Sequence, residues 1–111
     1  MKLDRDSNPN GLGKYAVIHL RRLVGETIRM VPASVRDAVK TLDDAGLIDW
    51  GKPGADDEFF LIKLRDTHAH VALQSYADSV RQAGNDPEFA DAVQALADRA
   101  GVNSAFCKNP D

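Results

Sequence analysis

The side chains best suited to hold a metal ion are Asp66, His68 and His70, because carboxylates and imidazoles are common ligands of divalent metals. Side chains two residues apart on a helix point about 200° away from each other, so the two histidines cannot share one ion. The acidic runs at 43–44 and 56–58 do not have the spacing of a calcium-binding loop. We therefore expect no metal site.

The segment Asn8–Lys14 offers glycines and a lysine that could surround a phosphate group. A nucleotide-binding loop needs four residues between its first glycine and the Gly-Lys pair, followed by Ser or Thr, and here Tyr15 follows the lysine. His19 and Cys107 lie in no recognisable catalytic motif, and a single cysteine excludes an internal disulfide. We expect no catalytic residue and no cofactor, so the sequence favours a protein that is not an enzyme.

Charge along the chain indicates where a binding partner could make contact. The 111 residues carry a net charge of −3, which argues against general affinity for nucleic acid or for an anionic membrane. Residues 1–40 carry eight basic and four acidic side chains, whereas residues 56–111 carry five basic and ten acidic ones. This asymmetry predicts a dipolar molecule whose basic part meets an anionic ligand or partner.

Four residues are predicted to contact that partner. Arg21, Arg22 and Arg29 are the candidates for anion binding, because a guanidinium presents a planar fork of donors that suits carboxylates and phosphates. Trp50, beside a glycine-containing loop, is the candidate aromatic anchor of a protein interface. The alternatives are simple solvent exposure for the arginines and a place in the core for the tryptophan.

The first third of the chain is predicted to begin with a flexible arm at residues 1–13, which contain polar residues, proline and glycine without an apolar period. The apolar run at 15–20 favours a strand, and the alternative is a helix that continues to Val24. A second strand is predicted at 27–31, where polar and apolar residues alternate.

The middle of the chain predicts a helix and two strands. Ser34 is expected to cap a helix that ends at Gly46, and residues 47–50 are expected to form a short strand. A turn-rich loop at 51–57 leads to the strongest predicted strand, at 58–65. Its four consecutive apolar residues, 59–62, predict a central strand covered on both faces.

Two helices are predicted next. The first is capped near Asp66 or Thr67 and ends at Gly84, and the second begins at Asp86 with proline in its first position and ends at Gly101. Residues 102–111 are predicted to be an irregular tail. We thus predict one α+β domain over residues 1–111, in which three helices pack on a small, mainly antiparallel sheet.

The order of elements in residues 35–64 resembles the recognition helix and wing hairpin of winged-helix proteins, which would imply a DNA-associated regulator. The helix carries Arg36 and Lys40 but also three acidic residues, and the wing loop adds two more. These carboxylates would repel phosphates, so a sequence-reading role is not favoured.

Three stretches carry a wider resemblance: GKYAVIHLR at 13–21, PGADDEFFLIKLRD at 53–66, and the pairs Ala72-Leu73 and Tyr76-Ala77. Together they resemble a group of small uncharacterised bacteriophage and prophage proteins. The group has no activity to carry over, so the resemblance implies no catalytic residue. It implies a protein of the host cytoplasm that binds a host factor, a class that includes inhibitors of bacterial defence systems.

The leading functional hypothesis is therefore a small non-catalytic protein that binds a host protein or a small anionic ligand. The charged, polar start of the sequence and the absence of an apolar run of about 18 residues favour the cytoplasm and argue against a membrane partner. The alternatives are the winged-helix regulator and a small enzyme or nucleotide-sequestering protein. A homodimer through the alanine-rich final helices is left open by the sequence.

Overall fold

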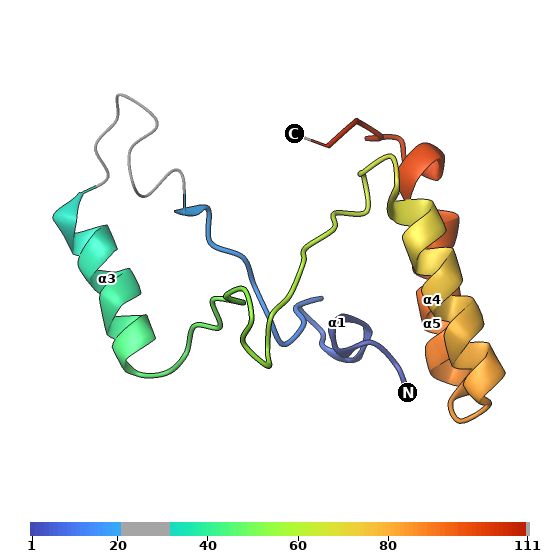
Figure 1. Ribbon diagram of the computed structural model, residues 1–111, viewed down its shortest axis with the longest axis horizontal. Helices are drawn as coiled ribbons and strands as arrows, with labels where there is room; N and C mark the ends of the chain where they lie inside the picture. Colours follow the sequence, from blue (N-terminus) through green and yellow to red (C-terminus); the bar gives the residue numbers. More distant parts are fainter. Residues whose placement is uncertain (21–31, 111) are drawn as a thin grey trace. The chain divides into compact units, whose positions relative to one another are not determined.

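The computed structural model describes residues 1–20 and 32–110, which contain four α-helices and one 3₁₀ helix. These elements are α1 (Asp4–Ser7), α3 (Ala33–Asp44), α4 (Ala69–Ala83), α5 (Pro87–Asp98) and η1 (Gly101–Asn103) (Figure 1). The chain divides into two compact units. Unit 1 comprises Met1–Tyr15 and Leu61–Asp111, and unit 2 comprises Ala16–Phe60.

The predicted sheet is wrong, because residues 1–20 and 32–110 contain no strand. Residues 15–19, 47–50 and 58–63, all expected in strands, have neither helical nor strand hydrogen bonding. The only β-type pairing in the described part is an isolated parallel bridge between Asp66 and Lys108. The predicted strand at 27–31 lies outside the described residues. Residues 1–20 and 32–110 form helices and irregular segments, so the fold of the described chain is helical.

The apolar run at 59–62 shows why the strand prediction failed. Its residues are exposed by 56%, 88%, 59% and 41%, the opposite of a strand covered on both faces. A strand needs neighbouring strands to satisfy its backbone groups, and no neighbour forms in the described chain. Phe59 instead packs its ring on Gly51, where a Cβ atom would lie only 2.4 Å from the ring.

Helix α3 in unit 2 confirms the predicted end of a helix but not its predicted start. Ser34 lies inside the helix, and the residue at the N-cap position is Pro32, which makes no side-chain cap. The end is a left-handed turn at Gly46 with φ +74°. The backbone N–H of Leu47 donates to the Leu42 carbonyl at 3.0 Å, and that of Gly46 donates to Asp43 at 2.9 Å. This pair of bonds is a Schellman motif, which glycine favours.

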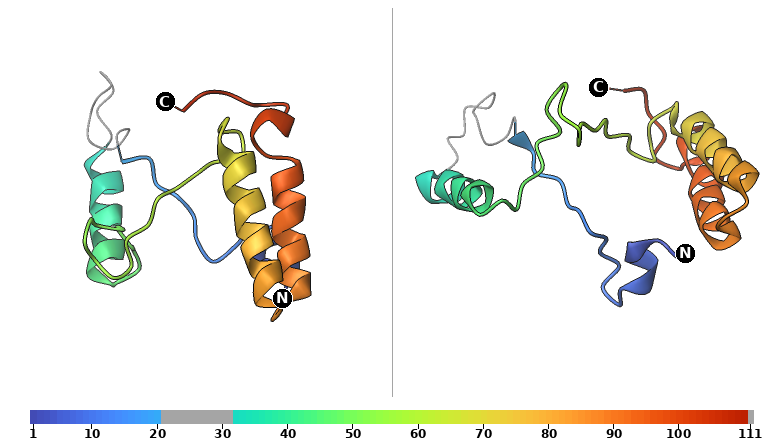
Figure 2. Two further views of the ribbon diagram at one scale, coloured as in Figure 1. Left: turned by 45° about the vertical axis from the view of Figure 1, so that its right-hand side comes forward. Right: turned by 60° about the horizontal axis from the view of Figure 1, so that its bottom comes forward.

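Unit 1 is built on the pair α4 and α5, which lie side by side and run antiparallel (Figures 1 and 2). Most of the buried side chains in this pair are alanine, whose small size lets two helix backbones approach closely. The buried hydrophobic residues of the described chain are Ala69, Ala77, Ala90, Val93, Ala97 and Ala100. These alanines therefore serve the contact between α4 and α5.

Polar and aromatic contacts reinforce the helix pair. Gln74 and Gln94 exchange two amide hydrogen bonds of 2.8 and 2.7 Å, and Arg81 Nη1 donates to Gln94 Oε1 at 2.9 Å. Tyr76 and Phe89 meet edge to face, with ring centroids 6.2 Å apart. This geometry is the favoured one for an aromatic pair.

The buried face of α4 agrees only in part with the predicted one. Helical spacing in the sequence predicts one inward face made of Ala69, Ala72, Leu73, Tyr76, Val80 and Ala83. Ala69 is buried and Leu73 and Val80 are half-buried, but Ala72, Tyr76 and Ala83 are exposed, and Ala77 is fully buried. The close contact between α4 and α5 buries the face that carries Ala69 and Ala77, just over two turns apart, with half-buried Leu73 between them.

Helices α5 and α4 differ in how their first turns are capped. Asp86 caps α5 as predicted, and its carboxylate accepts the Phe89 N–H at 3.0 Å. Contact with the N-terminal ammonium, and then this N–H bond, hold the pKa of Asp86 below its ordinary value. Helix α4 begins at Ala69, and its N-cap residue His68 makes no side-chain cap. Asp66 accepts the His68 N–H at 2.8 Å just before the helix.

Gly101 joins three segments of unit 1. Its backbone N–H donates to the Leu64 carbonyl at 2.7 Å, which ties the end of α5 to the segment that precedes α4. Its φ is +58°, and a Cβ atom would lie 3.0 Å from both His70 N and Thr67 O. Only glycine adopts this positive φ without strain and leaves room for the neighbouring backbone. Gly101 therefore allows the end of α5 to contact the segment before α4.

We predict that Gly101→Ala destabilises unit 1 more than Gly84→Ala does. Both glycines have positive φ, but a Cβ atom at Gly84 would meet nothing within 4 Å. The strained conformation costs roughly 1–2 kcal/mol in either variant, and the steric overlap adds to it only at Gly101. Urea unfolding followed by far-ultraviolet circular dichroism measures the difference. Equal losses of stability in the two variants would contradict the close approach at Gly101.

Candidate anion-binding site

An open pocket of about 730 Å³ lies in unit 1, beside the end of α5. Three chain segments contribute to it: the approach to α4, the end of α5, and the residues from η1 onward. The lining residues are Lys63, Leu64, Arg65, Arg99, Asn103, Ser104, Ala105 and Phe106.

Backbone hydrogen bonds hold these segments in place. The Gly101–Leu64 bond fixes the approach to α4 against the start of η1. The Lys108 N–H donates to the Arg65 carbonyl at 3.0 Å, and the Thr67 N–H donates to the Lys108 carbonyl at 3.1 Å. Residues 104–106 are thereby enclosed between two anchored points, although residues 102–111 were predicted only as an irregular tail.

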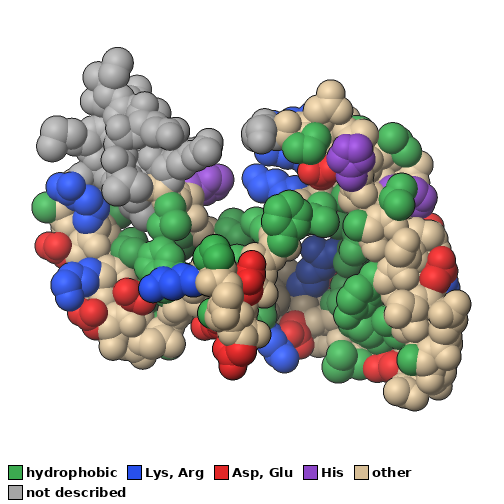
Figure 3. Space-filling view, viewed as in Figure 1, with side chains coloured by type: hydrophobic (Ala, Val, Ile, Leu, Met, Phe, Trp, Pro, Cys, Tyr) green, Lys and Arg blue, Asp and Glu red, His purple; other side chains and the backbone are tan. Residues whose placement is uncertain are grey.

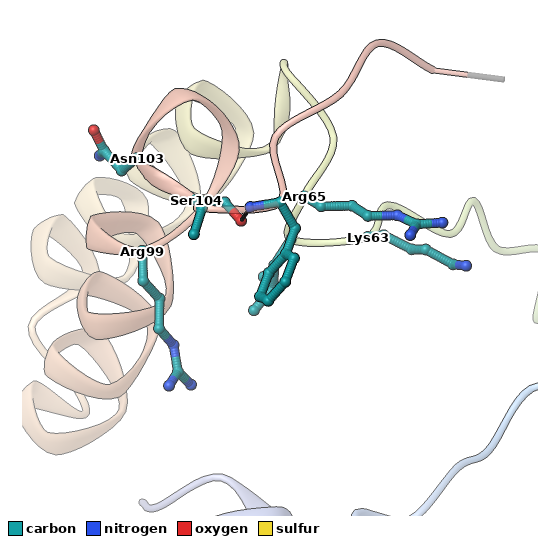
Figure 4. Close-up of a pocket in the computed structure, with 8 residues that line it drawn as sticks. Lys63, Arg65, Arg99, Asn103 and Ser104 are labelled. Atoms are coloured by element: carbon teal, nitrogen blue, oxygen red, sulfur yellow. Dashed lines mark hydrogen bonds between the residues drawn. The ribbon is translucent and has the colours of Figure 1, made fainter.

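Three cations lie around the pocket, and no carboxylate lines it. Lys63 and Arg65 are two residues apart and extend in the same direction in Figure 4, whereas Arg99 points from the end of α5 along a different line. Lys40 pairs with Asp44 at 2.7 Å and Arg81 with Asp78 at 3.3 Å. Within residues 1–20 and 32–110, by contrast, no ion pair neutralises Lys63, Arg65 or Arg99.

The space between the cations is largely apolar. Leu64, Ala105 and Phe106 line it, and Phe106 is 79% exposed. The Ser104 hydroxyl accepts the Phe106 N–H at 3.1 Å, which shapes the turn, and its own proton is left to donate (Figure 4). The pocket thus offers an apolar surface flanked by positive charge, an arrangement that suits a ligand with an apolar group next to an anionic one.

Of the four residues predicted to bind the partner, the structure describes only Trp50. Arg21, Arg22 and Arg29 lie outside the described residues. Trp50 belongs to unit 2, is 36% exposed, and donates its indole N–H to Asp43 Oδ1 at 2.7 Å.

The sequence contained a signal for the pocket that we did not use. Lys63 and Arg65 are basic residues at i and i+2, a spacing that places side chains on one side of extended chain. Because residues 58–65 were interpreted as a central strand, we assigned Lys63 and Arg65 to that strand and did not consider them as residues that bind a ligand. The third cation, Arg99, is 34 residues away and joins them only through the Gly101–Leu64 contact.

The candidates for metal and catalytic chemistry are not brought together. Among residues 1–20 and 32–110, no group of three His, Cys, Asp or Glu side chains is placed to hold a metal ion. His70 uses its Nδ1 proton to bond the Ala97 carbonyl at 2.7 Å, while His68 is exposed. Cys107 is exposed, with the Thr67 hydroxyl 3.9 Å from its sulfur.

A smaller pocket of about 310 Å³ lies where the N-terminal segment of unit 1 meets Leu96 of α5. Arg5 and Lys14 contribute to its lining, and Lys14 pairs with Asp4 at 3.7 Å. Arg5 Nη2 has no hydrogen-bond partner in the described chain, but it is buried beneath neighbouring atoms and a ligand cannot reach it. The larger pocket is the better candidate.

Comparison of the chain with protein-family models, curated proteins and solved structures finds no match. Function must therefore be argued from the site itself. The helices of residues 1–20 and 32–110 are all too short or too polar to cross a lipid bilayer.

We predict that Asp43→Ala frees the Trp50 side chain, because the indole N–H loses its carboxylate acceptor. Trp50 is the only tryptophan in the chain, so its fluorescence reports this site alone. The emission maximum should move to longer wavelength and acrylamide quenching should increase. The matched control is Asp44→Ala, which removes the neighbouring carboxylate that pairs with Lys40. Identical spectra for the two variants would contradict the Trp50–Asp43 bond.

Proposed function

We propose that this chain is a small non-catalytic binding protein that receives an anionic group of a partner protein in the pocket beside α5. The observation that carries the proposal is the cluster of Lys63, Arg65 and Arg99, which no carboxylate of the described chain neutralises.

Physical chemistry favours an anionic occupant. Like charges around one pocket repel each other, and an anion placed among them converts that repulsion into attraction. Arginine adds specificity, because its guanidinium forms two parallel hydrogen bonds with a carboxylate or phosphate. Phe106 supplies exposed aromatic surface next to these charges, and aromatic residues and arginine are enriched at the centres of protein interfaces.

The surroundings of the pocket favour a short anionic segment over a long polyanion. Residues 56–111 carry twice as many acidic as basic side chains, so the cationic cluster lies within an acidic half of the sequence. A nucleic acid would extend its phosphates beyond three cations towards carboxylates that repel them. The β-hairpin that a winged-helix regulator needs is also absent from residues 47–64.

The resemblance to small phage proteins supplies the biological setting of the proposal. A host protein of the bacterial cytoplasm is the proposed partner, and an inhibitor of a bacterial defence system is the proposed kind of activity. A small anionic ligand would suit the same cations but would leave much of an open pocket of about 730 Å³ unfilled. A protein segment fills such a site more completely.

The test is a capture experiment from bacterial lysate with the whole chain as bait. We expect a specific protein to be retained by the wild type and lost with Lys63→Glu combined with Arg65→Glu, because charge reversal turns attraction into repulsion. The expected loss is tenfold or more, equivalent to about 1.4 kcal/mol of binding free energy. Quantitative mass spectrometry of the retained proteins measures it.

The control is Lys2→Glu combined with Arg36→Glu, which changes the net charge equally at two exposed cations that do not line the pocket. This variant should retain the partner. If no retained protein distinguishes the pocket variant from the control, the pocket is not the binding site and the proposal fails.

A further inference from the structure

We propose that, in the absence of another partner, the pocket beside α5 is occupied by residues 56–60 of a second copy of this chain. This inference rests on the proposed function, because it uses the same cations and the same apolar surface. It adds a specific ligand for them, a segment in which three acidic residues precede two phenylalanines.

The segment has the two kinds of group that the pocket requires. Asp56, Asp57 and Glu58 carry three negative charges, and no ion pair within the described residues neutralises them. Phe60 directly follows and is 88% exposed, the largest exposed fraction among the large hydrophobic residues described. An acidic run beside a bare aromatic ring matches an apolar surface flanked by three cations.

Contacts within unit 2 hold the segment 56–60 so that Phe60 remains exposed. The Gly54 N–H donates to Glu58 Oε1 at 2.9 Å, which holds the turn before the segment. Phe59 packs on Gly51 and so faces its own unit. Phe60, the next residue, is 88% exposed and so remains free for a partner. Figure 3 shows hydrophobic side chains at the surface among polar and charged ones.

The occupant is a second copy and not the same chain, because only Leu61 and Ile62 separate Phe60 from Lys63. Placing Phe60 in the pocket of its own chain would require a tight reversal within these residues. Residues 58–63 contain no turn, and a β-branched isoleucine does not favour one. Each copy offers one segment and one pocket, so two copies can exchange segments and close a two-fold symmetric dimer.

Sedimentation velocity tests the inference with charge-reversal variants of the whole chain, over roughly 10 µM to 1 mM protein, the range in which weak interfaces assemble. We expect the wild type to dimerise and the dimer to weaken with added salt. Lys63→Glu with Arg65→Glu, and separately Asp56→Lys with Asp57→Lys, should each weaken dimerisation about tenfold or more. Phe60→Ser should weaken it as well, while Lys2→Glu with Arg36→Glu should not.

The decisive comparison combines the two charge reversals. A chain that carries both should dimerise again, because the opposite charges still face each other with their signs exchanged. An equimolar mixture of the two single-surface variants should also form dimers, since one of the two exchanged contacts then pairs a lysine-bearing segment with a glutamate-bearing pocket. Circular dichroism of each variant establishes that α4 and α5 remain folded.

Three results would overturn the inference: a monomeric wild type throughout the range, dimers that the charge reversals leave unchanged, or no recovery in the combined variant. A peptide with the sequence of residues 56–60 separates this failure from failure of the pocket. If the chain is monomeric but still captures a lysate protein through Lys63 and Arg65, self-association is wrong and the proposed function stands. If neither the peptide nor any lysate protein depends on these cations, both proposals fail.

Discussion

The close approach of backbone at Gly101 is the contact on which the rest of unit 1 depends. Alanine at the α4–α5 contact brings the helices together, and the glycine then allows the chain to pass against Thr67 and His70. Its N–H reaches the Leu64 carbonyl only at this short range. Lys63 and Arg65 on one side and Arg99 on the other are brought to one pocket as a result. The cationic pocket therefore depends on the small side chains of the α4–α5 contact and on Gly101.

Local signals in the sequence predicted the helices well. Asp86 with Pro87 marked the start of α5, and Gly46 and Gly84 follow α3 and α4 with positive φ. Each of these signals acts within a few residues, through a cap or a left-handed turn, and does not depend on the rest of the fold. The inward face of α4 was less predictable, because the partner helix decides whether alanine or tyrosine is buried.

The sheet could not be rejected from the sequence, because the run at 59–62 has the composition of a buried strand. A strand forms only if partners supply hydrogen bonds, and sequence composition does not reveal whether partners exist. The pocket was missed for a related reason. Arg99 is distant from Lys63 and Arg65 in the sequence, and their meeting depends on one backbone contact at Gly101. The exposed phenylalanine and the unneutralised cations become interpretable only once the sheet is abandoned.

The central claim is that residues 64–67, the end of α5 and the C-terminal segment form one cooperative structure that holds the pocket cations together. Amide hydrogen exchange measured by NMR tests it directly at Gly101, Thr67 and Lys108, whose N–H groups bond Leu64, Lys108 and Arg65. The account predicts that these amides are protected and exchange together with the amides of α4 and α5. Exchange of all three at the rate of an unstructured peptide, while the helices remain protected, would contradict it.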